Sequence, residues 1–330
     1  MKMIKMQNIV ILGAGSIGTA LGNSLAVRND LKVTLLSVEN EVVDSIATTH
    51  FNQKYFPNIR LIPALMATTD PAVLKEAHIV FIAIPSVAVV KYIQEIKPLL
   101  PESAILINLA KGFGCQDKII SQCLKGIVVN PVCALKGPSF AREIINNSPT
   151  AFTLASTEEG LCRDLEPVFD NTNIFVDTSL DLLGVEIISI LKNIYAILIG
   201  IVDAHFNSPN LRFMMFTRAF NEMRNILVHF GGQEETLLHY CGIGDFGLTA
   251  LNDLSRNRTL GLLIGKGFFN EGIPNKVVLE GRIAMSIILK KLIESNMPET
   301  GYHMMLQLDK VFAGDTDIAE FVNKLINERY

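Results

Sequence analysis

The sequence contains no tryptophan, and only 19% of its 330 residues are charged. Its 29 lysine and arginine residues are outnumbered by 33 aspartate and glutamate residues, so the formal net charge is -4 at pH 7. A chain without a basic excess lacks the electrostatic field that attracts nucleic acid. We therefore expect no nucleic-acid partner, and any anionic small molecule must be held by a few individually placed cations.

Cysteine is also scarce, with five residues scattered along the chain and no C-x-x-C pair. This pattern argues against a disulfide scaffold and fits free thiols in a reducing cytoplasm, which is the expected location. His229, His239 and Cys241 are close in sequence but lack the spacing of metal ligands. We therefore predict no metal site.

Apolar residues are abundant instead, at 49% of the chain, and two segments imitate membrane signals. The first 26 residues resemble a signal peptide but lack a convincing small-residue cleavage site. Residues 184–202 are almost continuously apolar over about the length of a bilayer span. Glu186 and Lys192 interrupt this stretch, and a lysine at its middle would be costly in lipid. We predict a buried helix and no stable membrane insertion.

The order of expected elements divides the chain into two domains. Apolar and β-branched runs predict strands at 8–12, 32–36, 79–84, 104–108 and 127–130. Strands that alternate with helices favour a doubly wound, mostly parallel α/β sheet of the Rossmann type. Long apolar or amphipathic segments then predict helices at 184–202, 212–230 and 277–295. We place a dinucleotide-binding domain at residues 1–181 and a helical substrate-binding and catalytic domain at 182–330.

The first expected strand leads directly into Gly13-Ala14-Gly15-Ser16-Ile17-Gly18 and then into an expected helix. In this pattern the first glycine permits the turn, the second lets a pyrophosphate approach the backbone, and the third allows close helix–strand packing. The helix N-terminus supplies unpaired N–H groups to the phosphates. We predict NAD or NADP as the cofactor, over a glycine-rich turn without a ligand. Further on, Glu39 either accepts a hydrogen bond from the ribose or is a solvated surface charge.

Two later segments are candidates for ligand contacts. Lys111 follows an expected strand at the carboxyl edge of the sheet, where ligands of open α/β folds bind. It either reaches a ligand oxygen or is an ordinary surface lysine. The run Gly137-Pro138-Ser139-Phe140-Ala141-Arg142-Glu143 predicts a helix start with Pro138 near its first position. Its amides either meet an anion or form an ordinary helix cap.

Lys192 lies within the long apolar helix, which makes it the most informative residue of the second half. Ala196 and Gly200 follow at helical spacing, so we expect a small-residue face beside the lysine that leaves room for a ligand. Desolvation lowers the pKa of a lysine and suits it to proton transfer. The alternative is a lysine that extends to the surface.

Polar residues gather again after this helix. Asp245 follows two closely spaced glycines and is a candidate partner for a nearby lysine. The cluster Ser255-Arg256-Asn257-Arg258 groups donors that a phosphate or a carboxylate would need together. A solvated loop is the alternative interpretation.

Taken together, these motifs resemble the bacterial NAD(P)-dependent glycerol-3-phosphate dehydrogenases over nearly the whole chain. The most specific are G-P-S-F-A-x-E at 137–143, L-K-N at 191–193 and S-R-N at 255–257. The glycine pattern, Pro85-Ser86, Lys111-Gly112, Pro149-Thr150-Ala151, Gly184-Val185-Glu186, Gly244-Asp245 and Glu280-Gly281 complete the series in order.

The resemblance implies a helical domain of the 6-phosphogluconate dehydrogenase-like type. It also implies reversible hydride transfer between NAD(P)H and C2 of dihydroxyacetone phosphate, a small phosphate ester, giving sn-glycerol 3-phosphate for phospholipid synthesis. Lys192 would be the proton donor and acceptor, Asp245 would position it and bind substrate, and Lys111 would hold substrate and cofactor. The implied substrate contacts are Gly137, Ser139, Lys192, Ser255, Arg256 and Asn257. The implied cofactor contacts are Gly13, Gly15, Ser16, Ile17, Gly18, Val38, Lys111, Ala141, Arg256, Val278 and Glu280.

Some positions depart from the family pattern. Val38 stands where the family often carries an arginine or histidine near the adenosine ribose, which leaves the choice between NAD and NADP open. Residues 203–210 lack glycines that are usual after the aspartate, and Ala219 replaces another. These changes would reshape the second domain while the proposed chemical residues persist.

Two other functions compete with this interpretation. A β-hydroxyacid dehydrogenase has the same two-domain plan, but it binds a carboxylate, and the S-R-N cluster with the G-P-S-F-A run argues against it. A non-catalytic dinucleotide sensor would not need Lys111, Lys192 and Asp245 together. Analogy with the family also leads us to expect a homodimer through the helical domain.

Overall fold

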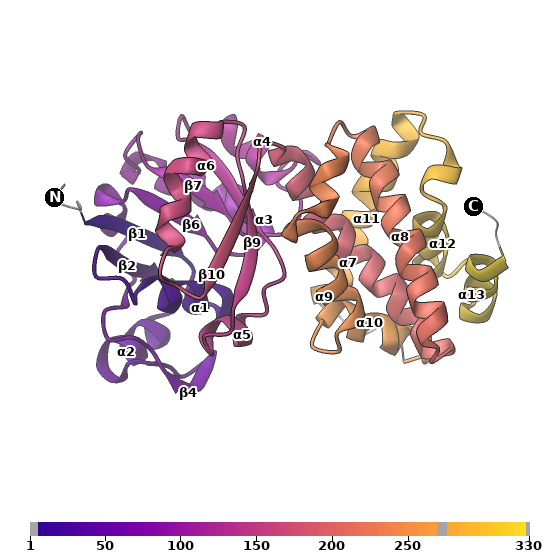
Figure 1. The fold of residues 1–330 in the computed structure, drawn as a ribbon, viewed down its shortest axis with the longest axis horizontal. Helices are drawn as coiled ribbons and strands as arrows, with labels where there is room; N and C mark the ends of the chain where they lie inside the picture. The colour runs from indigo at the N-terminus through magenta and orange to yellow at the C-terminus, as the bar shows by residue number, and fades with distance from the viewer. Residues whose placement is uncertain (1–5, 269–275, 328–330) are drawn as a thin grey trace. The chain divides into compact units, whose positions relative to one another are not determined.

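The computed structural model describes residues 6–268 and 276–327, with the side chains of 276–279 outside the description. The chain divides into two compact units, Met1–Leu182 and Leu183–Tyr330 (Figure 1).

The first unit contains an eight-stranded sheet in the order β10-β9-β8-β7-β6-β1-β2-β5 (Figure 1). All neighbouring strands are parallel except β8 and β9. The strands are β1 (Gln7–Leu12), β2 (Leu31–Leu36), β5 (Met66–Thr68), β6 (Ile79–Ile82), β7 (Ile105–Asn108), β8 (Val132–Lys136), β9 (Thr150–Ala155) and β10 (Ile174–Ser179). A separate antiparallel pair consists of β3 (Phe51–Asn52) and β4 (Phe56–Arg60).

The sheet is buried on both faces, as parallel sheets usually are. Ile9 and Ile11 of β1 belong to one apolar cluster, and Val10 and Leu12 belong to another. Because successive side chains of a strand point to opposite faces, these clusters are the cores on the two sides of the sheet. The helices of this unit are α1 (Ser16–Leu25), α2 (Asn40–Thr49), α3 (Ser86–Ile96), α4 (Ile120–Lys125), α5 (Ala141–Ile145) and α6 (Glu159–Leu165).

The strand order reverses at β1. The chain first moves from β1 to its neighbour β2, and later returns to form β6 on the other side of β1. In an open α/β sheet the crevice outside the carboxyl ends of the strands at such a reversal is where ligands bind. The glycine-rich turn directly follows β1 and therefore lies at this position.

Most strands expected from apolar runs are confirmed, but the strand expected at 127–130 is wrong. This segment forms a turn and irregular backbone, and β8 begins at Val132. Pro131 has no N–H to donate to a sheet, and the side chain of Val129 is 75% exposed. β9 and β10, which complete the sheet beyond β8, were not among the expected strands.

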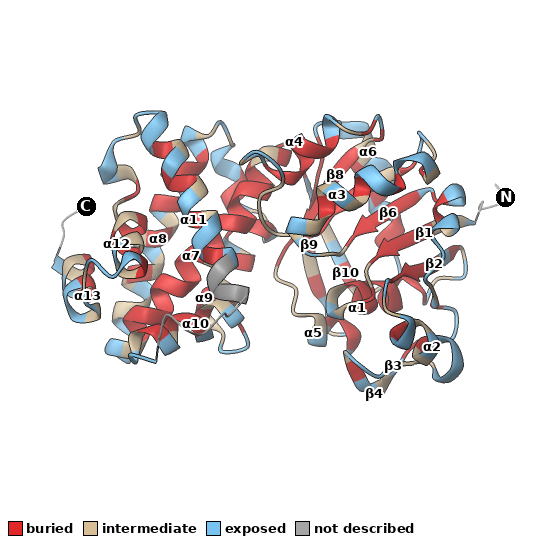
Figure 2. Cartoon of the chain, turned by 180° about the vertical axis from the view of Figure 1, so that it is seen from behind, coloured by how far each residue is buried: buried red, intermediate tan, exposed pale blue. Residues whose placement is uncertain are grey.

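Every described element of the second unit is a helix. These are α7 (Leu182–His205), α8 (Pro209–His229), α9 (Asp245–Leu251), α10 (Arg256–Gly265), α11 (Lys276–Glu294), α12 (His303–Ala313) and α13 (Ile318–Asn327), with short helical turns between them. α7 is long and apolar enough to cross a membrane, yet 94% of its most apolar window is buried within the protein. Figure 2 shows it as the buried centre of this unit, which confirms the expected buried helix.

Glycines bring α7 and α10 into backbone contact. A Cβ on Gly200 would lie 2.5 Å from the carbonyl oxygen of Arg258, and one on Gly261 would lie 2.1 Å from that of Ile197. The small-residue face of α7 therefore accommodates a second helix. The expectation that Gly200 leaves room for a ligand is wrong.

This crossing predicts a position-specific effect of adding a methyl group. Gly261→Ala should lower the free energy of unfolding by about 1–3 kcal/mol, because two backbones must separate to admit the Cβ. Gly247→Ala is the matched control, since Gly247 also lies within a helix and nothing is within 4 Å of its missing Cβ. That change should be neutral or stabilise by up to about 1 kcal/mol. Urea unfolding measures both, and equal effects would contradict the proposed crossing.

Candidate active site

The three glycines of the turn after β1 have distinct environments. Gly13 has a φ of +101°, a conformation that L side chains rarely adopt. A Cβ on Gly18 would lie 2.1 Å from the carbonyl oxygen of Gly13, so α1 packs directly on the turn. Gly15, between them, has nothing within 4 Å of its missing Cβ. These are the turn, packing and open positions that a dinucleotide site requires.

The N-terminus of α1 is suited to an anion. Its N-cap is Gly15, which provides no side-chain hydrogen bond, and no acidic residue lies in the first turn. Ser16 is exposed and Ile17 is half-buried. Free backbone N–H groups and the positive end of the helix dipole favour phosphate at this point. The residues present therefore fit the pyrophosphate of a dinucleotide.

The segment after β2 combines an exposed apolar residue with a paired carboxylate. Val38 is 86% exposed. The carboxylate of Glu39 accepts hydrogen bonds from Lys54 Nζ at 2.7 Å and Tyr55 Oη at 3.1 Å. The hydrogen bond from Lys54 lowers the pKa of Glu39. Glu39 is therefore an ionised carboxylate that is paired with Lys54 and remains 33% exposed.

Lys111 lies just beyond β7, and its side chain is half-buried. Gly112, which follows it, has a φ of +148°, and a Cβ there would lie 2.7 Å from Ser86 Oγ at the start of α3. Both the backbone conformation and the space beside it therefore favour glycine after Lys111.

The segment after β8 approaches the neighbouring strand closely. A Cβ on Gly137 would lie 2.4 Å from the carbonyl oxygen of Ala151 in β9, and Ser139 Oγ donates to the carbonyl of Gly137 at 2.9 Å. The predicted helix start with Pro138 near its first position is wrong, because α5 begins at Ala141, with Phe140 as its N-cap. Residues 137–138 form a bend where Gly137 packs on β9, and the helix begins only after two further residues.

In the second unit, α7 and α9 bring Lys192 and Asp245 together. Lys192 Nζ donates to Asp245 Oδ1 at 2.5 Å, and the two side chains are 3% and 2% exposed. The same ammonium donates to Thr249 Oγ1 at 2.7 Å. Lys192 therefore does not extend to the surface. Thr249 was not among the predicted site residues. Its place one helical turn after Asp245, which puts both side chains on one face of α9, is the signal that could have found it.

The Ser255–Asn257 cluster forms the start of a helix rather than a solvated loop. Ser255 is the N-cap of α10 and is 4% exposed, and its Oγ accepts a hydrogen bond from the backbone N–H of Arg258. Arg256 is exposed and Asn257 is half-buried. Arg258 turns inward and donates to Asp203, which also receives a hydrogen bond from Arg212. The arginine available to an external ligand is therefore Arg256.

The remaining predicted contacts lie on α11. Glu280 is exposed, and the side chain of Val278 lies outside the described residues. Among the described residues, no group of three or more histidine, cysteine, aspartate or glutamate side chains is placed to hold a metal ion.

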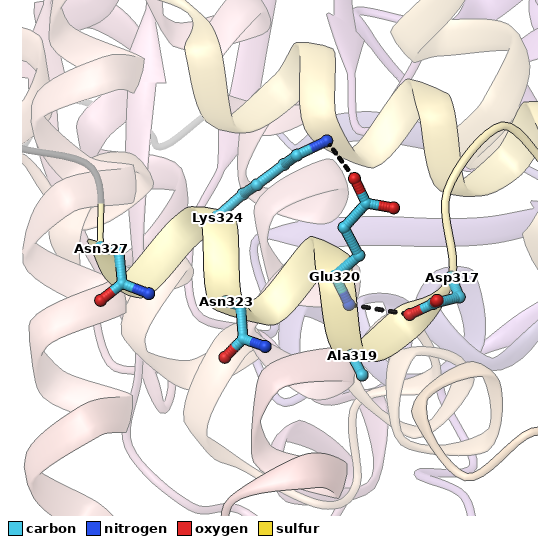
Figure 3. Close-up of a pocket in the computed structure, with 6 residues that line it drawn as sticks. All are labelled: Asp317, Ala319, Glu320, Asn323, Lys324 and Asn327. Carbon is cyan, nitrogen blue, oxygen red and sulfur yellow. Dashed lines mark hydrogen bonds and ion pairs between the residues drawn. The ribbon is translucent and has the colours of Figure 1, made fainter.

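A shallow depression along α13 contains none of the predicted residues (Figure 3). Lys324 and Glu320, one turn apart, form an ion pair at 2.6 Å across it. The backbone N–H of Glu320 donates to Asp317 Oδ1 at 2.8 Å. These contacts are those of an ordinary capped surface helix.

A glycine turn at the reversal point of a parallel sheet, followed by a helical unit with a buried lysine, is typical of two-domain dehydrogenases that use a nicotinamide dinucleotide. The chain belongs to the NAD-dependent glycerol-3-phosphate dehydrogenase family. The model of the family's N-terminus matches residues 8–162, and that of its C-terminus matches residues 181–323.

Individual relatives match along the whole chain. The glycerol-3-phosphate dehydrogenase [NAD(P)+] of Halothermothrix orenii is 33% identical over 96% of this chain and 94% of its own. The crystal structure of glycerol-3-phosphate dehydrogenase from Coxiella burnetii superposes with a TM-score of 0.86 at 30% identity, covering 98% of this chain and 99% of that one. A yeast glycerol-3-phosphate dehydrogenase shares the fold, with a TM-score of 0.84 at 19% identity over 98% and 100% of the two chains.

The Lys192–Asp245 pair predicts an asymmetric effect of removing its charges. Asp245→Ala should lower the free energy of unfolding at pH 7 by about 3–5 kcal/mol, because it leaves a buried ammonium without its counter-charge. The double variant Lys192→Met/Asp245→Ala should recover much of this loss, because no unpaired charge remains. Urea denaturation measures these two variants and the single variant Lys192→Met.

The exposed pair of Lys91 and Glu95 provides the control. Glu95→Ala should change the free energy of unfolding by less than about 1 kcal/mol. The loss of unfolding free energy in Lys192→Met/Asp245→Ala is then compared with the sum of the losses in the two single variants. Equal values would show that the buried pair is not a coupled unit.

Proposed function

We propose that this protein is an NAD(P)-dependent glycerol-3-phosphate dehydrogenase. It transfers a hydride reversibly between NAD(P)H and C2 of dihydroxyacetone phosphate, which gives sn-glycerol 3-phosphate. The observation that carries the proposal is the ammonium of Lys192, which Asp245 and Thr249 hold in the interior. Relatives that match nearly the full chain are named for this activity. Residues 1–181 would bind the dinucleotide, and residues 182–330 the substrate.

Lys192 is the acid and base of the proposed reaction. When bound, the nicotinamide supplies or accepts the hydride. In the direction of reduction the C2 oxygen gains negative charge, which the Lys192 ammonium stabilises and then neutralises by donating a proton. Asp245 favours the charged form of the lysine and thereby its recharging from solvent. Thr249 fixes the direction of the ammonium, which removes a reorganisation step from the barrier.

Anionic groups of both ligands need placed donors, because the chain carries no general positive field. We assign the substrate phosphate to the N-terminus of α10, where Arg256 is exposed and backbone N–H groups favour a dianion. The further substrate contacts are Lys111, Gly137, Ser139, Ser255 and Asn257. The dinucleotide contacts are the glycine turn, Ser16, Ile17, Ala141 and Glu280. A cytoplasmic homodimer is the assembly that we expect.

The assay that tests the function mixes the purified protein with NADH or NADPH and dihydroxyacetone phosphate and follows loss of the reduced cofactor. Lys192→Ala should lower kcat by about 10²–10⁴-fold and leave NADH affinity, measured by fluorescence titration, unchanged. Thr249→Val should lower kcat by about tenfold, because the ammonium remains but loses one partner.

Absence of turnover with either cofactor would overturn the proposed activity. Tight dinucleotide binding without turnover would support the sensor function instead. Unchanged turnover in Lys192→Ala would remove this lysine from the mechanism.

The environment of Glu39 predicts a preference for NADH. An ionised carboxylate after β2 accepts hydrogen bonds from a ribose diol and repels a 2′-phosphate, while Val38 supplies no compensating cation. Glu39→Gln should raise the ratio of kcat/KM for NADPH to that for NADH by about tenfold, equivalent to about 1.4 kcal/mol. Lys54→Met, which retains the carboxylate, should not raise this ratio. An unchanged ratio in Glu39→Gln would place this carboxylate away from the ribose.

A further inference from the structure

A second buried lysine, Lys136, has no role in the reaction described above. It ends β8 and is only 1% exposed, which makes it one of the largest fully buried side chains. An ammonium in the interior is costly unless hydrogen bonds compensate it. The partners of Lys136 therefore indicate why this position carries a lysine.

The ammonium of Lys136 donates to two main-chain carbonyls at the end of the neighbouring strand. It lies 3.1 Å from the carbonyl oxygen of Asn108, the last residue of β7, and 2.5 Å from that of Ala110. Hydrogen bonds from a charged donor are stronger than those between neutral groups. Lys136 therefore anchors the backbone immediately before Lys111.

Ala110 is also held through its own backbone N–H. The backbone N–H of Ala110 donates to Asn108 Oδ1 at 2.9 Å. Beyond Lys111, Gly112 has a φ of +148°, and a Cβ there would meet Ser86. The observed anchors are therefore the hydrogen bonds on the side of Lys111 that precedes it in the chain. An anchored backbone at this point limits the directions open to the Lys111 side chain.

Lys136 also belongs to the next ligand-contacting segment. It directly precedes Gly137, whose backbone packs on β9 and whose carbonyl accepts a hydrogen bond from Ser139. We propose that Lys136 is a positioning residue whose buried ammonium joins the Lys111 turn to the Gly137–Ser139 segment. The proposal rests on the proposed function, because it assumes that Lys111 contacts the substrate and cofactor.

A double-mutant cycle tests this link. Lys136→Met removes the charged donor but retains a side chain of similar length, and it should lower kcat/KM for dihydroxyacetone phosphate by about 10–100-fold, the size of effect produced by an ångström-scale misplacement. In a Lys111→Met background the same change should cost less than about twofold, because the residue it positions is gone. If Lys136→Met lowers kcat/KM by the same factor in both backgrounds, the effects are independent and the proposal is overturned.

Asn130 provides a matched control. Its Nδ2 donates to the carbonyls of Pro101 at 2.7 Å and Ala104 at 2.8 Å, so it anchors backbone at the opposite end of β7. Asn130→Ala should lower the thermal midpoint but leave kcat/KM within about twofold in both backgrounds. A loss of kcat/KM as large as that of Lys136→Met would mean that any damage to β7 suffices, which would also overturn the specific role.

Hydrogen exchange separates failure of this proposal from failure of the proposed function. Lys136→Met should accelerate amide exchange over residues 108–112 by at least about tenfold, while the Gly13–Gly18 turn stays unchanged. This readout needs no turnover. Unchanged exchange at 108–112 would overturn the positioning role even in an active enzyme. If exchange is accelerated in Lys136→Met but the wild-type protein has no turnover, Lys136 still anchors this backbone and only its link to the reaction is rejected.

Discussion

The helical unit depends on one electrostatic constraint, the need to neutralise Lys192 inside an apolar helix. α7 is buried over most of its length, so an ammonium at its centre requires a counter-charge from elsewhere in the fold. α9 meets that requirement with Asp245, and Thr249 one turn later accepts a second hydrogen bond. The glycine-mediated crossing of α7 and α10 then fixes the helix whose first turn carries Arg256. The lysine that imposes this structural requirement is also the group to which we assign proton transfer.

The Rossmann unit satisfies a different constraint, which is close approach of backbone to backbone. Gly18 lets α1 rest on the turn after β1, Gly112 lets the Lys111 turn meet Ser86, and Gly137 lets the next segment pack on β9. In each case the side chain that is missing would collide with protein atoms. Gly15, within the turn after β1, has open space beside it instead. The glycines of that turn therefore differ, since Gly18 serves packing and Gly15 leaves the backbone accessible.

Local pattern predicted much of the fold, because apolar strands and long buried helices carry their signal in consecutive residues. It failed where tertiary contacts decide. β10 was missed since it is an edge strand with an exposed Phe175. Asp245 was a candidate partner for a lysine, but its contact with Lys192 spans 53 residues and has no local signal. The contacts of Lys136 with Asn108 and Ala110 could not be recognised, because they are made to main-chain carbonyls, which every residue possesses.

The two buried lysines show how the partner determines what an interior charge can do. The ammonium of Lys136 donates to the carbonyl oxygens of Asn108 and Ala110, so its hydrogen bonds tie β8 to the backbone at the end of β7. The ammonium of Lys192 donates to a carboxylate and a hydroxyl on one helix, and it is the group to which we assign proton transfer to the developing alkoxide. Identical side chains with similar burial thus acquire different roles. Geometry places the two ammonium groups differently, because Lys136 lies beside main-chain carbonyls at the end of β7 and Lys192 lies beside two side chains of α9.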